Sequence, residues 1–149
     1  MNEEPDRRAI IAWTRLLRSH QLSLERVEKA LKAADLPPLR WYDVLLELHR
    51  AGRDGLRQFE IGNAVLLSKH NVSRLLDRLE REALVVRQAC DEDGRGARVF
   101  ITEAGHHLLA RMWPVYGAAI RASFERYFSV QELDQLATLL ARLPDVGDG

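Results

Sequence analysis

Basic and polar side chains recur at helical spacing in residues 68–81, which read SKHNVSRLLDRLER. The first half of this stretch holds Lys69, His70 and Arg74 and contains no acidic residue. The guanidinium of arginine forms paired hydrogen bonds with phosphate or guanine. On a helix, one stripe of the surface would carry His70, Ser73, Arg74 and Arg78. The stretch therefore predicts a helix that contacts nucleic acid; the alternative is an ordinary helix with a solvated face.

A second group of charged residues lies in residues 90–101, which read CDEDGRGARVFI. The flanking stretches are rich in β-branched and aromatic residues, so they predict two strands joined by a glycine-bearing loop. Short acidic side chains cap turns, and a carboxylate can hold a guanidinium in one orientation. We expect Asp93 to organise the loop and one acid to pair with a nearby arginine; the alternative is that all the acids are solvated. The candidate arginines are Arg78, Arg81 and Arg98.

Two helices are expected upstream. From Asp6 to about Ala34, apolar residues recur at alternating spacings of three and four, which predicts one long helix. The prolines of DLPPL end it, because the residue before a proline disfavours the helical region. Residues 39–51, LRWYDVLLELHRA, then predict the second helix.

A short helix and a tight turn come next. Residues 56–65 predict about two turns of amphipathic helix, with Phe59 and Ile61 as the buried pair. Only LLS separates it from the basic helix, so the connection must be tight, with Ser68 as the N-cap. The basic helix has one apolar face, formed by Val72, Leu75, Leu76 and Leu79.

Two further helices are expected after the hairpin. Thr102 is expected to cap a helix over residues 103–128, in which Pro114 predicts a kink. Ser129 and Glu132 have the spacing of a capping box, which predicts the start of a last helix.

A short helix that turns directly into a second helix with a polar stripe is a helix-turn-helix, and a β-hairpin behind it is a wing. In this order the sequence resembles the MarR family of bacterial transcription regulators over nearly its whole length. The most specific parts are LLSKHNVSRLLDRLEREALVVR, DEDGRGARVFIT and TEAG. The resemblance implies a mainly α fold with a small β-hairpin wing, as a single domain over residues 1–149. Residues 39–101 would form the winged helix-turn-helix lobe that binds DNA, and residues 6–35 and 103–143 would form dimerisation helices.

A basic helix of this kind enters the major groove, where its N-terminal residues meet base edges. Ser73 and Arg74 are assigned to base edges or nearby phosphates. Lys69 and His70 are assigned to phosphates, and Arg78 to the flanking backbone. In the family the wing tip carries an arginine in or along the minor groove; Arg95 matches it, and Arg98 is a second candidate. The expected DNA-binding residues are Ser68, Lys69, His70, Ser73, Arg74, Arg78, Arg95 and Arg98.

The chain departs from the family pattern at Ala83, where the recognition helix usually ends in glycine. Alanine adopts the left-handed cap conformation only at a cost of roughly 1 kcal/mol. We therefore expect the helix to end differently or to be slightly strained.

The first helix and the last two carry more apolar residues than a small winged domain can cover. Some are expected to pack within the chain and the rest between two copies. The candidates are Trp13, Leu17, Leu24, Leu31, Leu109, Trp113, Tyr116, Ile120, Phe124, Leu136, Leu140 and Leu143. A homodimer would place two recognition helices roughly 34–36 Å apart and read an inverted repeat in double-stranded DNA.

Regulators of this type commonly respond to small aromatic or lipophilic molecules, so the resemblance implies an effector pocket. Its expected residues are Trp13, His20, Trp41, Asp43 and His49. Aromatic walls with a carboxylate and an imidazole suit a planar polar ligand. The alternative is that the tryptophans belong to the core and Asp43 to a buried polar network.

No cofactor or metal is expected. His106 and His107 are adjacent, so on a helix they point about 100° apart and cannot chelate a metal together. Cys90 is the single cysteine, which excludes an internal disulfide and fits a reducing compartment. We expect it to be a small packed residue.

The composition, 46% apolar and 30% charged, is that of a globular protein, and 22 basic residues balance 22 acidic ones. Any nucleic-acid surface must therefore come from local clustering of charge. The N-terminus lacks the apolar segment of a signal peptide, and no apolar run is long enough for a membrane span, so a cytoplasmic protein is expected. There is no phosphate-binding loop, metal-ligand spacing or nucleophile elbow, so an enzyme is not expected.

The sequence thus predicts a homodimeric transcription regulator that binds a specific DNA site, as a repressor released by a small aromatic effector. The alternative is a winged helix that binds another protein and has no specific DNA site. The acid-free SKHNVSR favours DNA, and a steep dependence of affinity on salt would distinguish the two.

Overall fold

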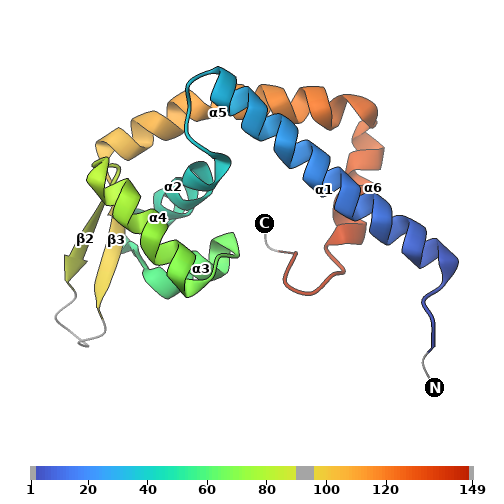
Figure 1. Cartoon of the computed structure of the whole chain (residues 1–149), viewed down its shortest axis with the longest axis horizontal. Coiled ribbons are helices and arrows are strands. Elements are labelled where there is room, and N and C mark those ends of the chain that lie inside the picture. The colour runs from blue at the N-terminus through green and yellow to red at the C-terminus, as the bar shows by residue number, and fades with distance from the viewer. Residues whose placement is uncertain (1–2, 90–95, 148–149) are drawn as a thin grey trace. The chain divides into compact units, whose positions relative to one another are not determined.

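The structure is a computed structural model of the chain and describes residues 3–89 and 96–147. It contains two compact units, one made of residues 1–30 with 116–149 and the other of residues 31–115. The described helices and strands are drawn in Figure 1. The helices are α1 (Arg7–Ala33), α2 (Leu39–Ala51), α3 (Gln58–Val65), α4 (Lys69–Arg81), α5 (Glu103–Ser123) and α6 (Val130–Leu140), with short 3₁₀ turns η1 (Gly52–Asp54) and η2 (Glu125–Tyr127). The strands are β1 (Leu56–Arg57), β2 (Val85–Ala89) and β3 (Ala97–Ile101). The mainly α winged-helix fold expected from the sequence is confirmed.

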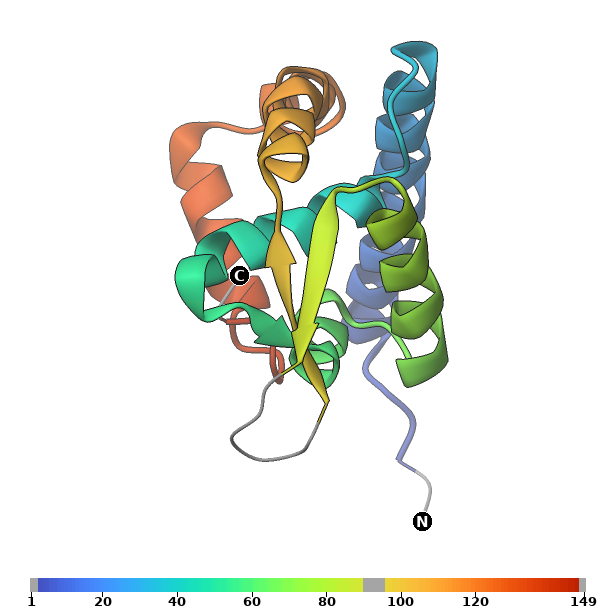
Figure 2. The ribbon, with the colours of Figure 1, turned by 90° about the vertical axis from the view of Figure 1, so that its left-hand side faces the viewer.

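Residues 31–115 form the lobe that holds the helix-turn-helix and the sheet of the wing (Figure 2). Its core is apolar and comes from every helix of the lobe and from the sheet. The side chains with almost no exposed surface are Leu31, Val44, Leu45, Leu48, Ile61, Leu76, Leu79, Val72, Val85, Val99 and Met112. Leu31 was expected as one of the interface candidates, but it is buried within the chain.

The sheet has one more strand than the hairpin predicted. Its order is β1-β3-β2 and both pairings are antiparallel, with Leu56 opposite Val99 and Val85 opposite Ile101. Leu56 and Arg57 were expected at the start of a helix, and that prediction was wrong. A strand of two residues is too short to show a period of its own. Gly55 allows the close pairing, because a Cβ on it would lie 2.7 Å from the Val99 carbonyl oxygen.

The expected buried pair of α3 is half correct. Ile61 is fully buried, but 66% of the surface of Phe59 is exposed. Two residues apart on a helix means about 200° of rotation, so the two side chains cannot share one face. The buried face of α3 consists instead of Ile61, Gly62 and Val65.

The recognition helix α4 begins and packs as expected. The Ser68 hydroxyl accepts the backbone N–H of Asn71 at 3.3 Å, which makes Ser68 the N-cap. Val72, Leu76 and Leu79 are buried, and Leu75 is half-buried. The helix is held close to α3, because a Cβ on Gly62 would lie 3.1 Å from the Val72 methyl group Cγ2.

Ala83 lies just after the C-terminal end of α4, where glycine is usual in the family. Ala83 lies in the left-handed region at a φ of 58°. Its N–H donates to the Glu80 carbonyl at 2.9 Å, and the Leu84 N–H donates to the Leu79 carbonyl at 3.0 Å. These two bonds define a Schellman cap, so the helix ends as it would with glycine and alanine carries the strain.

The sequence TEAG attaches α5 to this cap. The Thr102 hydroxyl donates to the Ala83 carbonyl at 2.7 Å and accepts the Gly105 N–H at 3.1 Å. The Thr102 N–H donates to the Leu84 carbonyl at 3.0 Å. A Cβ on Gly105 would lie 2.5 Å from that same carbonyl oxygen. The end of α4 and the start of α5 are therefore held in direct contact.

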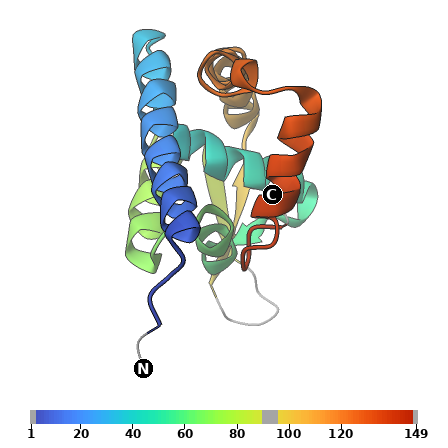
Figure 3. The ribbon, with the colours of Figure 1, turned by 90° about the vertical axis from the view of Figure 1, so that its right-hand side faces the viewer.

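The later helices follow the expected order with one boundary corrected. α5 runs through Pro114 but ends at Ser123, whereas a helix to residue 128 was expected. Phe124 leaves the helical region at a φ of −141°, and η2 follows before α6 (Figure 3). The capping box of α6 is confirmed, with the Ser129 hydroxyl accepting the Glu132 N–H at 3.1 Å. The hydrogen bonds with Ser129 hold the pKa of Glu132 below its ordinary value.

None of the described helices combines the length and apolar character that crossing a membrane requires.

Replacing Ala83 with glycine should stabilise the protein by about 0.5–1 kcal/mol, because glycine adopts the left-handed region without strain. Chemical unfolding in urea measures the change. Ala110→Gly is the matched control at an exposed position inside α5, and it should destabilise the protein by about 1 kcal/mol. A destabilising Ala83→Gly would contradict the strained cap.

Candidate nucleic-acid interface

The first half of α4 presents a positive, acid-free surface. Lys69, His70 and Arg74 are exposed, and Ser73 is half-buried. Ser68 is also exposed, but its hydroxyl is already engaged in capping the helix. The unpaired N–H groups of a helix N-terminus add partial positive charge to the same end. The structure thus brings together all the expected contacts from residues 68–74.

The acids in the second half of α4 have a cationic partner that sequence reasoning missed. The Arg87 guanidinium on β2 lies 2.7 Å from an Asp77 carboxylate oxygen and 3.9 Å from a Glu80 oxygen. Only 25% of the Arg87 side chain is exposed. The second guanidinium nitrogen, Nη2, is buried and has no hydrogen-bond partner among the described residues. Arg87 thus offsets part of the negative charge of Asp77 and Glu80 on the helix that is expected to face DNA.

No partner for Asp77 or Glu80 was expected from the sequence. Arg78, Arg81 and Arg98 were expected as partners for the acids of the loop, and those acids lie outside the described residues. The available signal was the alternation of the strand, since Arg87 stands two residues after the buried Val85 and therefore on the same face.

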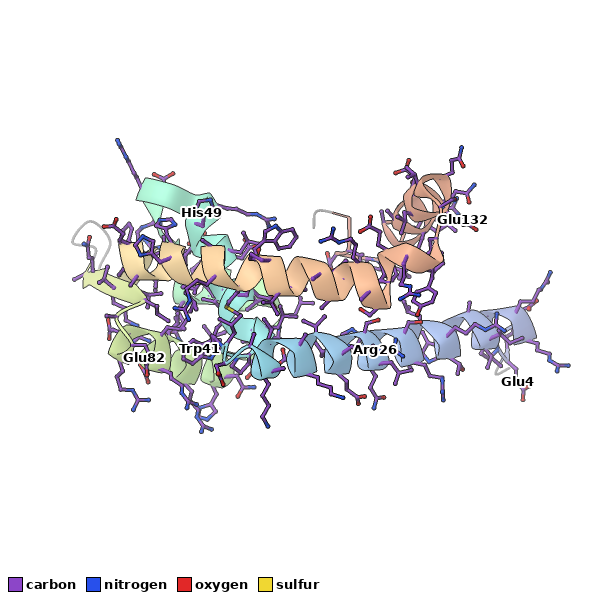
Figure 4. The ribbon with its side chains drawn as sticks, turned by 90° about the horizontal axis from the view of Figure 1, so that it is seen from above. Glu4, Arg26, Trp41, His49, Glu82 and Glu132 are labelled. Carbon is purple, nitrogen blue, oxygen red and sulfur yellow. The ribbon has the colours of Figure 1, made fainter. Side chains whose placement is uncertain are left out.

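Arg78 lies over an aromatic ring. Its guanidinium carbon is 6.0 Å from the centre of the Trp41 ring, which is cation–π range. Both side chains border an open hollow of about 650 Å³ between α2 and α4. The other lining residues are Arg74, Leu75, Asp77, Arg81 and Glu82. Figure 4 shows Trp41 and Glu82 on this side of the lobe.

Of the two wing arginines, only Arg98 lies within the described residues. Arg98 is half-buried on β3, and its guanidinium donates to the Asp54 carbonyl at 3.3 Å. That bond anchors it to the turn before β1 and leaves it further donors. Arg95, Asp93 and Cys90 lie outside the described residues.

The five expected effector residues are divided between the two units. Trp13 and His20 belong to the first unit, and the other three stand on α2 in the second. On α2 they point in different directions: Trp41 faces α4, whereas the His49 ring meets that of His106 on α5, with the two Nδ1 atoms 3.2 Å apart (Figure 4). Asp43, between them, is half-buried.

Tyr42, the neighbour of Trp41 on α2, belongs to the core of the lobe. It is buried and stacks on Trp113 with 6.4 Å between ring centres. Burial raises the pKa of the Tyr42 hydroxyl above its ordinary value. Within residues 3–89 and 96–147, no group of three or more side chains is arranged to hold a metal ion.

Replacing Arg87 with glutamine should weaken binding to a DNA duplex by a factor of about five, because Asp77 and Glu80 would then repel the phosphates. Fluorescence anisotropy at low salt measures the affinity, and adding Asp77→Asn to Arg87→Gln should restore most of it. Arg111→Gln, which removes the same charge from the exposed side of α5, is the control. Equal losses in the two single variants would show that only net charge matters.

Residues 34–96 match the model of the MarR family. The structure of AbsC, a MarR family transcriptional regulator from Streptomyces coelicolor, is similar at 26% identity with a TM-score of 0.82, covering 93% of each chain. Sco3205, a MarR family transcriptional regulator from the same organism in complex with DNA, shares the fold at 21% identity and a TM-score of 0.84, covering 93% of this chain and 87% of that one.

A third structure, CouR from Rhodococcus jostii RHA1 bound to p-coumaroyl-CoA, is 28% identical with a TM-score of 0.71, covering 84% of this chain and 85% of that one. The family match spans the helix-turn-helix, and the structural matches extend over nearly the whole chain. Residues 34–96 thus match the MarR family, and the chain is similar over nearly its whole length to solved structures of MarR family transcription regulators.

Proposed function

We propose that the protein is a transcription regulator that binds an inverted repeat in double-stranded DNA as a homodimer, and that it is a repressor released by a small aromatic effector. The observation that carries this proposal is the charge pattern of α4. Its N-terminal half exposes Lys69, His70 and Arg74 without an acid, and Arg87 offsets part of the negative charge of Asp77 and Glu80. A protein of zero net charge concentrates positive charge at this surface.

In this proposal α4 enters the major groove by its N-terminal half. Ser73 and Arg74 meet base edges or nearby phosphates, with Lys69 and His70 on the backbone. Arg78 contacts the flanking backbone, and the Trp41 ring restricts the positions that its guanidinium can take. Arg95 and Arg98 extend the contact from the wing. Sco3205, which has the same fold, is in complex with DNA, and this supports DNA binding by the present chain.

The case for a homodimer comes from the unit of residues 1–30 and 116–149. In α1, Ile10, Trp13 and Leu17 are 50%, 61% and 48% exposed. In the C-terminal part of the same unit, Tyr127 and Val130 are 65% and 77% exposed, and no residue of α6 is buried. So much exposed apolar surface indicates a partner, and a second copy is the partner that a two-fold DNA site requires.

The proposed effector is a small aromatic molecule. CouR binds an aromatic acyl-CoA, which supports an aromatic effector here. Trp41 is the expected effector residue with both a hollow and charged neighbours around it. An effector held there would compete with DNA for Arg74 and Arg78. The other expected residues, Trp13, His20, Asp43 and His49, stay as predictions. A regulator of this kind acts on chromosomal DNA, so we place it in the cytoplasm.

Selection from a random duplex library should enrich an inverted repeat whose half-sites lie one helical turn apart. Anisotropy across a salt series then measures the affinity for the enriched site. Arg74→Ala should abolish the preference for that site, and Arg95→Ala should weaken binding and lower the salt slope by about one. If no site is enriched and binding shows no salt dependence, the winged helix binds another protein instead.

Leu17→Glu combined with Leu143→Glu should convert a dimer into a monomer, because each change places a charge in the proposed apolar interface. Sedimentation equilibrium measures the mass, and circular dichroism checks that the helices are retained. Arg15→Glu is the control, since residue 15 lies about 200° around the helix from Leu17. A wild-type protein that is monomeric at micromolar concentration would refute the dimer.

A further inference from the structure

The turn of the helix-turn-helix holds a leucine in a conformation that suits glycine. Leu66 follows α3 directly and lies in the left-handed region at a φ of 56°. For a residue with a side chain this region is disfavoured by roughly 1–2 kcal/mol relative to glycine. At 86%, Leu66 is also the most exposed large apolar residue of the described chain. Its side chain therefore contributes little packing that would offset the strain.

The fold imposes this conformation. The Leu67 N–H donates to the Gly62 carbonyl at 3.0 Å, and the Arg40 guanidinium donates to the Val65 carbonyl at 2.6 Å. The chain is thus fixed on both sides of Leu66. The contact between Gly62 and α4 leaves little room for another path. Hydrogen bonds and packing set the backbone angle of residue 66, but nothing in the lobe explains why a leucine occupies it.

Leu66 and Ala83 both have a left-handed backbone, but their side chains have different surroundings. Ala83 carries only a methyl group, and its carbonyl accepts the Thr102 hydroxyl inside the lobe. Leu66 carries a large apolar side chain into solvent, two residues before the N-cap of the recognition helix. Strain that persists without an internal benefit points to a role in binding.

We propose that Leu66 is a specificity-determining residue, which makes an apolar contact with the methyl group of a thymine in the major groove. This inference rests on the proposed function. The N-terminal end of a recognition helix is where side chains meet base edges, and the thymine methyl is the apolar group displayed there. Leu66 precedes Lys69, His70 and Ser73 by three to seven residues, and in this proposal it adds a hydrophobic contact to their polar ones.

The test separates stability from affinity. Leu66→Gly and Leu66→Asn relieve the strain, so both should raise the melting temperature. Both should also weaken binding to the selected site about tenfold, because part of a leucine side chain no longer leaves water. The salt slope should stay unchanged, since no phosphate contact is lost. Leu66→Met keeps the apolar side chain and should bind like the wild type.

Ala83→Gly is the matched control, because it relieves the same kind of strain away from the proposed contact. It should raise the melting temperature and leave the affinity unchanged. Replacing the thymines of the selected site one by one with deoxyuridine removes single methyl groups. At one position in each half-site this should weaken wild-type binding several-fold and leave Leu66→Ala binding unchanged.

Three results would overturn the inference: unchanged affinity in Leu66→Gly, a changed oligomeric state in that variant, or no thymine whose methyl group matters only when Leu66 is present. A wild-type protein that selects no site has a different meaning. It would remove the proposed function itself, and it is seen before any variant is made.

Discussion

The position of the recognition helix depends on a small hydrogen-bonded joint at its C-terminal end. There the Thr102 hydroxyl donates to the Ala83 carbonyl and accepts the Gly105 N–H, while its backbone N–H donates to the Leu84 carbonyl. One residue thus ties the end of α4, the start of β2 and the first turn of α5 together. The joint closes only because residue 105 has no Cβ and residue 83 accepts a left-handed backbone. The direction in which α4 leaves the lobe follows from this contact.

The two halves of α4 differ in charge. A neutral protein cannot rely on net charge to attract DNA, so the sign of the charge at each position on α4 matters. The N-terminal half has no acid. The C-terminal half has Asp77 and Glu80, and Arg87 of β2 offsets part of their charge. Arg87 thereby links the wing to the recognition helix, since it belongs to β2 and holds side chains of α4. This charge arrangement depends on the same joint, which sets the distance between the two elements.

The lobe also holds two residues with side chains in the left-handed backbone conformation, which glycine would adopt without strain. Ala83 and Leu66 end the two helices of the helix-turn-helix in the left-handed region. At Ala83 the fold recovers the strain through a complete cap and the bond from Thr102. At Leu66 the side chain is almost entirely exposed, and several apolar residues of α1 and α6 are about half exposed or more. These exposed apolar side chains are the surfaces that the proposed DNA contact and the proposed homodimer would cover.

The sequence by itself determined the order of the helices, the caps at Ser68 and Ser129, the recognition helix with its buried face, and the two long strands of the wing. These features are local: each follows from a spacing of a few residues or from one capping side chain. The tertiary structure decided β1, the exposure of Phe59, the end of α5 at Ser123, the pairing of Arg87 with Asp77 and the meeting of His49 with His106. The two-residue β1 exists only because β3 pairs with it, and a spacing along the chain names neither partner of the two side-chain pairings, although strand alternation places Arg87 on the face of Val85. The left-handed backbone at Ala83 lies between these cases, because the sequence raised the question and only the bonds to Glu80, Leu79 and Thr102 answered it.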